Sequence, residues 1–70
     1  MYLFKKELRD EILKKYKMKY LANMIGIHEI HLSKILHNKS KTSKPVAYLF
    51  TKLIDKDAEI SDYFINTKEE

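Results

Sequence analysis

Hydrophobic residues recur at helical spacing in the first part of the chain. Before residue 17 the apolar positions are Leu3, Phe4, Leu8, Ile12, Leu13 and Tyr16, with charged residues between them. Residues three or four apart share one face of a helix, so this spacing predicts a helix of about 13 residues within residues 3–16. Between residues 18 and 25 a shorter pattern puts Leu21, Ala22 and Ile25 on one face and predicts a second helix.

Gly26, the single glycine of the chain, follows this second pattern directly. A glycine in that place takes the left-handed conformation that ends a helix. The next pattern begins near His28 and extends to His37, with Leu32, Ile35 and Leu36 within one third of the helix circumference. Asn38 follows, and asparagine substitutes for glycine at a left-handed helix end. Residues 28–37 are therefore predicted to form a third helix.

Pro45 suits the first turn of a fourth helix, with Ser43 or Lys44 at its cap. Four apolar residues follow at positions i, i+3, i+4 and i+7, namely Val46, Leu49, Phe50 and Leu53. Ile60, Tyr63 and Phe64 predict a short fifth helix, and residues 66–70 a frayed tail. Because no alternating strand pattern is longer than a few residues, the sequence predicts one all-α domain of four to five short helices over residues 1–70.

The charge of the chain is distributed unevenly. Lysine and arginine exceed aspartate and glutamate by fourteen to ten, and between residues 14 and 52 the single acidic residue is Glu29. A small basic domain attracts phosphate backbones at long range, so this pattern indicates a polyanionic partner. The chain has no cysteine, which fits a reducing compartment and excludes thiol chemistry. Its apolar runs are too short for a signal sequence or a membrane span, so we expect a cytoplasmic protein without a membrane partner.

Enzyme chemistry has no support in these residues. There is no phosphate-cradling glycine loop and no nucleophile with a plausible base, so we expect no catalytic residues, no cofactor and no small-molecule ligand. His28 and His31 are one turn apart, whereas His37 lies on a different face, and no carboxylate or cysteine completes a metal site. The histidines are expected instead at the edges of their helices, where they would contact the phosphates of a polyanionic partner.

The stretch from Met18 to His37 resembles the helix-turn-helix of the Cro and phage-repressor (XRE-like) family of DNA-binding proteins. That motif has apolar, small and glycine residues at fixed places, and here those places hold Leu21, Ala22, Ile25, Gly26, Ile27, Leu32 and Ile35. The resemblance extends over about residues 3–65 and implies a lambda-repressor-like domain in a bacterial cell or phage-infected host. In that fold a helix crosses closely over Ala22, so this residue must be small.

Carried over by position, the resemblance assigns contacts with DNA bases to Glu29, Ile30 and Lys34. Glu29 would accept from a cytosine amine, Ile30 would contact a thymine methyl, and Lys34 would donate to guanine or to a phosphate. His28 and Ser33 would lie nearer the sugar-phosphate edge. In the alternative interpretation, Ile30 is a minor core contact and Glu29 is a solvated charge at the positive end of a helix.

Contacts with the DNA backbone are expected from two basic segments that precede helices. The residues are Lys17, Lys19, Lys39, Lys41, Thr42, Ser43 and Lys44. Many family members carry glutamine at the first motif position, where this chain has Met18, so that phosphate contact is expected to move to Lys17 or Lys19.

The sequence thus predicts a transcriptional regulator that binds double-stranded DNA, a repressor of phage, plasmid or mobile-element type. A homodimer on an inverted repeat is expected because one module covers too few base pairs for strong specificity. Tyr63, Phe64 and Ile65 are the predicted dimer contact. The alternative is a helical protein-interaction module, such as an antirepressor, an antitoxin or an adaptor.

Overall fold

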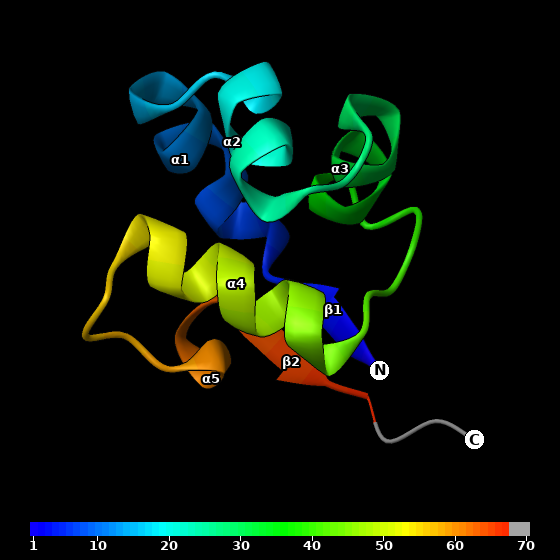
Figure 1. Cartoon of the computed structure of the whole chain (residues 1–70). Helices are drawn as coiled ribbons and strands as arrows, with labels where there is room; N and C mark the ends of the chain where they lie inside the picture. Colours follow the sequence, from blue (N-terminus) through cyan, green and yellow to red (C-terminus); the bar gives the residue numbers. More distant parts are fainter. Residues whose placement is uncertain (68–70) are drawn as a thin grey trace.

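A computed structural model describes residues 1–67 of the chain (Figure 1). In chain order the elements are β1 (Tyr2–Phe4), the 3-10 helix η1 (Lys6–Leu8), α1 (Arg9–Lys15), α2 (Met18–Ile25), α3 (Glu29–Leu36), α4 (Lys44–Ile54), α5 (Ile60–Tyr63) and β2 (Phe64–Asn66). The predicted second, third and fourth helices are confirmed to within a residue at each end. The domain is mostly helical, as predicted.

The all-α prediction holds only in part, because the mostly helical domain also contains a small antiparallel sheet. β1 pairs with β2 in the register Tyr2 to Asn66, Leu3 to Ile65 and Phe4 to Phe64. On its other edge β1 meets Thr42, where the backbone N–H of Tyr2 and of Thr42 each donate to the other residue's carbonyl at 2.8 Å. The two strands and the segment before α4 are therefore held together by backbone hydrogen bonds.

Both ends of the chain differ from the predicted helix and tail. The α-helix expected within residues 3–16 begins only at Arg9, because Leu3 and Phe4 belong to β1 and residues 6–8 form the 3-10 helix η1. At the other end, α5 stops at Tyr63, and the N–H of Thr67 donates to the Met1 carbonyl at 3.0 Å. The predicted tail thus begins inside β2, and its residues 68–70 lie outside the described part of the chain. A short apolar run is ambiguous between helix and strand, and here its distant partner decided the outcome.

Three phenylalanine rings form the centre of the core. Phe4, Phe50 and Phe64 are each 1–2% exposed, and their ring centroids are 5.5 to 5.7 Å apart in edge-to-face pairs. Such pairs contribute about 0.5–1.5 kcal/mol each beyond the burial of their area. Because the rings come from β1, α4 and β2, this cluster unites the sheet with the longest helix.

The face of α4 that packs against the core differs from the face that carries its large apolar residues at helical spacing. Ala47, Phe50 and Thr51 are 0–1% exposed, whereas Leu49 is 48% exposed. The buried stripe is therefore shifted by one residue, about 100° around the helix.

Candidate nucleic-acid interface

The turn between α2 and α3 is set by Gly26. Its φ is +89°, as the sequence predicted, and both its own N–H and that of Ile27 donate to the Ala22 carbonyl at 2.9 and 3.1 Å. A Cβ built at Gly26 would meet no atom within 4 Å, so the glycine is needed for its backbone conformation rather than for space. Ala22 is 3% exposed between the two helices. This junction fixes the angle between α2 and α3.

Histidine side chains lie at both ends of α3. His28 is the N-cap, and its Nδ1 accepts the backbone N–H of Ile30 at 3.1 Å. Accepting this bond requires Nδ1 to be unprotonated. At the other end, His37 Nδ1 lies 3.1 Å from the Ser33 carbonyl. Asn38 then takes φ +60° and donates from Nδ2 to the Phe4 carbonyl at 2.7 Å, which ties the end of α3 to β1.

The two faces of α3 have opposite environments. Leu32, Ile35 and Leu36 are 0–1% exposed and belong to the core. On the outer face Glu29 and Lys34 are exposed, and Ile30 is 62% exposed. The alternative interpretation of Ile30 as a core contact is wrong. Ser33 is half-buried, on the edge between the two faces.

A hollow of about 540 Å³ lies between α2 and the start of α3. It is lined by two apolar residues, Ala22 and Ile27, and by the polar residues Lys17, Lys19, Tyr20, Asn23, His28 and Glu29. The structure thus brings together the sequence-predicted backbone contacts Lys17, Lys19 and His28. It adds Tyr20 and Asn23, which the sequence interpretation left without a role although they lie one turn apart on α2.

Tyr20 is held in place by a ring stack. Its ring lies 6.4 Å from that of Tyr16, with 10° between the planes, while its side chain remains 48% exposed. A tyrosine has an apolar ring and a polar tip, and here the ring has a partner while the residue faces solvent. The stack with Tyr16 therefore holds the Tyr20 ring at the edge of the hollow while its side chain stays accessible to solvent.

The basic segment before α4 is only partly available to a ligand. Lys39, Ser43 and Lys44 are exposed, and Lys41 is half-buried. Thr42 is 3% exposed and paired with Tyr2 through its backbone, so the prediction that it contacts a phosphate was wrong. Its place in the bridge to β1 removed it from the surface.

Comparison of the chain with protein-family models, curated proteins and solved structures found no match. The function of this surface is therefore inferred from its chemistry. Among residues 1–67, no three His, Cys, Asp or Glu side chains form a group suited to a metal ion. Within the same range, no helix has the length and apolar character needed to cross a membrane.

The three residues predicted for the dimer contact differ in their exposure to solvent. Phe64 is 2% exposed in the core, so its assignment to a dimer surface was wrong. Tyr63 is half-buried against the same core, whereas Ile65 is 51% exposed. Alternation along β2 sends neighbouring side chains to opposite faces of the sheet, which separates Phe64 from Ile65.

Proposed function

We propose that this chain is a sequence-specific regulator of transcription that binds double-stranded DNA as a helix-turn-helix protein, with α3 in the major groove. The observation that carries the proposal is the outer face of α3. There Ile30, at 62% exposure, lies with Glu29 and Lys34 on a helix whose other face is fully packed. Burial of Ile30 within its own domain does not account for it.

The chemistry of this face matches the groove edges of base pairs. The major groove is wide enough to admit a helix, and its base edges present donors, acceptors and the thymine methyl group. Glu29 is an acceptor for cytosine N4, Lys34 is a donor to guanine O6 or N7, and Ile30 is an apolar surface for a methyl group. A surface with acidic, basic and apolar side chains can distinguish one base sequence from another. Lysines alone attract any DNA, because every phosphate carries the same charge.

Backbone phosphates would be held on both sides of α3. The hollow with Lys17, Lys19 and Tyr20 lies before and at the start of α3, and the exposed Lys39 and Lys44 follow α3 in the chain. Contacts of this kind fix the position of the protein on DNA without selecting a sequence. Each phosphate neutralised would add about 0.9 to the negative slope of log affinity against log salt.

The regulator would act as a homodimer on an inverted repeat and would repress by occluding the polymerase. A single α3 contacts too few base pairs for a specific site in a genome, and two-fold symmetry doubles that number. Of the three residues predicted for the dimer, Ile65 remains as an exposed apolar candidate.

Selection of bound duplexes from a randomised pool tests this function directly. The wild-type chain is compared with Glu29→Ala/Lys34→Ala. A matched control, Glu7→Ala/Lys56→Ala, removes the same two kinds of charge at exposed positions outside α2 and α3. We expect wild type and control to enrich the same inverted repeat, with half-sites about 10 base pairs apart, and the α3 variant to lose it.

Other outcomes would redirect the proposal. Enrichment that survives in the α3 variant would show that a different surface selects the sequence. A folded protein that enriches no sequence would contradict sequence-specific binding and favour the protein-interaction module, for which a pull-down is the next experiment.

A further inference from the structure

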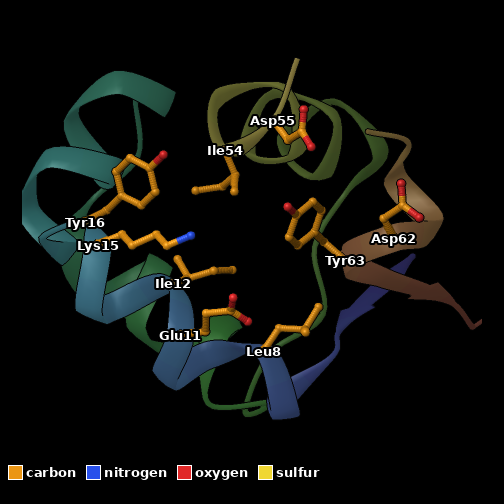
Figure 2. Close-up of a pocket in the computed structure, with 9 residues that line it drawn as sticks. All are labelled: Leu8, Glu11, Ile12, Lys15, Tyr16, Ile54, Asp55, Asp62 and Tyr63. Carbon is orange, nitrogen blue, oxygen red and sulfur yellow. The ribbon is translucent and has the colours of Figure 1, made fainter. Parts of the chain in front are cut away.

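A cleft of about 340 Å³ opens between α1, the end of α4 and α5 (Figure 2). Its apolar lining consists of Leu8, Ile12 and Ile54. None of the residues that line it belongs to α2 or α3, and in Figure 1 α1 and α3 lie on opposite sides of α2. The cleft is thus distinct from the surface proposed for DNA, and the two adjoin at the ring stack of Tyr16 with Tyr20.

The cleft carries negative charge in an otherwise basic protein. Three exposed carboxylates, of Glu11, Asp55 and Asp62, line it, against one cation, Lys15. Among residues 1–67 the ion pair found is Arg9 with Asp10, so none of these carboxylates is neutralised by a cation within 4.0 Å. Asp62 Oδ2 and Asp55 Oδ1 accept backbone N–H groups, of Glu59 at 2.8 Å and Asp57 at 3.0 Å, and these bonds leave the negative charge of the carboxylates in place.

Two helix ends add to the negative electrostatic potential of the cleft. Asp55 is the C-cap of α4, and Tyr16, which also lines the cleft, is the C-cap of α1. The C-terminal end of a helix carries partial negative charge, so the two helix ends and the three carboxylates act in the same direction. The pKa of the Tyr63 phenol responds accordingly: burial raises it, and so do Asp55, Asp62 and Glu11.

We propose that this cleft binds an arginine side chain presented by a partner protein. The guanidinium would lie among the carboxylates and against the ring of Tyr16 or Tyr63, and apolar neighbours of that arginine would cover Leu8, Ile12 and Ile54. Arginine suits this lining better than lysine because its planar group pairs with carboxylates in two-point contacts and stacks on aromatic rings. The apolar floor favours a peptide over a bare cation, since it offers area for neighbouring side chains.

Lys15 is a competitor that the chain itself supplies. Figure 2 shows its side chain extending toward the middle of the cleft. A bound guanidinium must displace the ammonium or lie beside it, at the cost of repulsion between like charges. Removing the charge of Lys15 and removing the charge of Asp55 are therefore expected to change affinity in opposite directions.

The test is an NMR titration of the full ¹⁵N-labelled chain with the peptide acetyl-Leu-Arg-Leu-amide. We expect amide shifts confined to residues 8–16 and 54–63. Asp55→Asn should weaken binding about fivefold and Lys15→Gln should tighten it about twofold, the size expected for single exposed charge pairs. Asn keeps the Oδ1 that accepts the Asp57 N–H at 3.0 Å, so the turn after α4 is retained.

Asp57→Asn is the matched control, because Asp57 is exposed in the same turn but does not line the cleft. The proposal is overturned if Asp57→Asn weakens binding as much as Asp55→Asn, or if acetyl-Leu-Glu-Leu-amide gives the same shifts. Shifts spread over all acidic residues, or none at all, would also contradict it. Cleft shifts that depend on protein concentration without peptide would identify a second copy of the chain as the occupant. Selection of DNA by Asp55→Asn should match wild type, which separates this proposal from the proposed function.

Discussion

Asn38 combines two structural tasks in one side chain. Its backbone takes the left-handed conformation after α3, and its Nδ2 donates to the Phe4 carbonyl at 2.7 Å. Glycine performs the first task more easily but has no side chain for the second. The asparagine therefore both ends α3 and ties it to β1.

Substitutions at Asn38 should separate these tasks. Asn38→Gly loses only the hydrogen bond and should lower the free energy of unfolding by about 1 kcal/mol. Asn38→Ala loses the bond and strains the backbone, for a total of about 2–3 kcal/mol. Urea denaturation of the two variants measures the difference. Equal stability of Asn38→Gly and wild type would mean that the bond to Phe4 contributes nothing.

Tyr63 gives the protein a predictable response to alkaline pH. Burial and the nearby carboxylates raise its pKa above the ordinary value of 10.0. The folded state therefore holds the phenol proton more tightly than the unfolded chain does. This contribution to stability is intact below pH 10.0 and is lost as the pH rises through the folded pKa.

Tyr63→Phe should remove this component. Thermal melting at constant ionic strength, from about pH 8 to pH 11, should show wild type losing stability more steeply than the variant above the ordinary tyrosine pKa. Parallel curves for the two proteins would show that the Tyr63 proton is not linked to folding.

Lys52 shows that the net charge of the chain overestimates the number of lysines that are available to bind a polyanion. Its Nζ donates to the carbonyls of Ala58 at 2.7 Å and Lys56 at 3.3 Å, and lies 5.6 Å from the centre of the Tyr48 ring. These contacts hold the segment between α4 and α5. A lysine with such partners stabilises the fold and is a poor candidate for a phosphate contact.

At the scale of single elements, the beginning of α3 depends on an unusual cap. His28 supplies the acceptor that serine, threonine, asparagine or aspartate usually provides. His28→Ala should lower the free energy of unfolding by about 1 kcal/mol, and His28→Asp should raise it because aspartate also suits the positive end of the helix. Chemical denaturation measures both. If the order were reversed, the bond to the Ile30 N–H would not cap the helix.

The outer face of α3 should tolerate truncation that its inner face does not. Ile30→Ala should change the free energy of unfolding by less than about 0.5 kcal/mol, whereas Leu32→Ala should cost about 2–5 kcal/mol. Melting of both variants makes the comparison, with helix content by circular dichroism as the control for folding. Equal losses would place Ile30 in the core.

The helix α4 shows that an apolar pattern predicts the presence of a helix more reliably than it predicts which face of the helix is buried. Val46, Leu49, Phe50 and Leu53 were correctly placed in a helix, but the buried face is the one with Ala47 and Thr51. Hydropathy favours the larger leucine for the core. Close packing instead buried Ala47 and Thr51 beside Phe50, all at 0–1% exposure, and left Leu49 in solvent.

At the scale of the whole molecule, the pairing of β1 with β2 closes the domain. β1 and β2 are separated by almost the full sequence and are paired in space, with Phe4 and Phe64 directly opposite each other. A chain of 70 residues has about 3–5 kcal/mol of stability to lose. The sheet and its phenylalanine cluster are therefore a large share of what keeps the fold intact.

Two neighbouring residues of β2 should differ sharply on truncation. Phe64→Ala leaves a cavity in the core and should cost about 3–5 kcal/mol, enough to abolish cooperative unfolding. Ile65→Ala, at a position 51% exposed, should leave the domain folded. Heteronuclear NMR spectra of the two variants make the comparison. A folded Phe64→Ala protein would show that the helices hold the domain without the sheet.

The sequence by itself determined the local features. Helical spacing located α2, α3 and α4, and the conformational freedom of Gly26 and Asn38 marked where two helices end. The pattern of α3 also separated its buried residues from Glu29, Ile30 and Lys34 on the outer face. These features follow from interactions between residues a few positions apart, which is why a pattern in the sequence records them.

The tertiary structure decided everything that depends on distant residues. Whether Leu3 and Phe4 form helix or strand was settled by their pairing with Ile65 and Phe64. The same pairing buried Phe64, and the bridge to Tyr2 withdrew Thr42 from the surface. The acidic cleft likewise arises only where α1, α4 and α5 meet. Such contacts join residues far apart in the chain, and the energy that selects them comes from burial in a shared core, which no local pattern encodes.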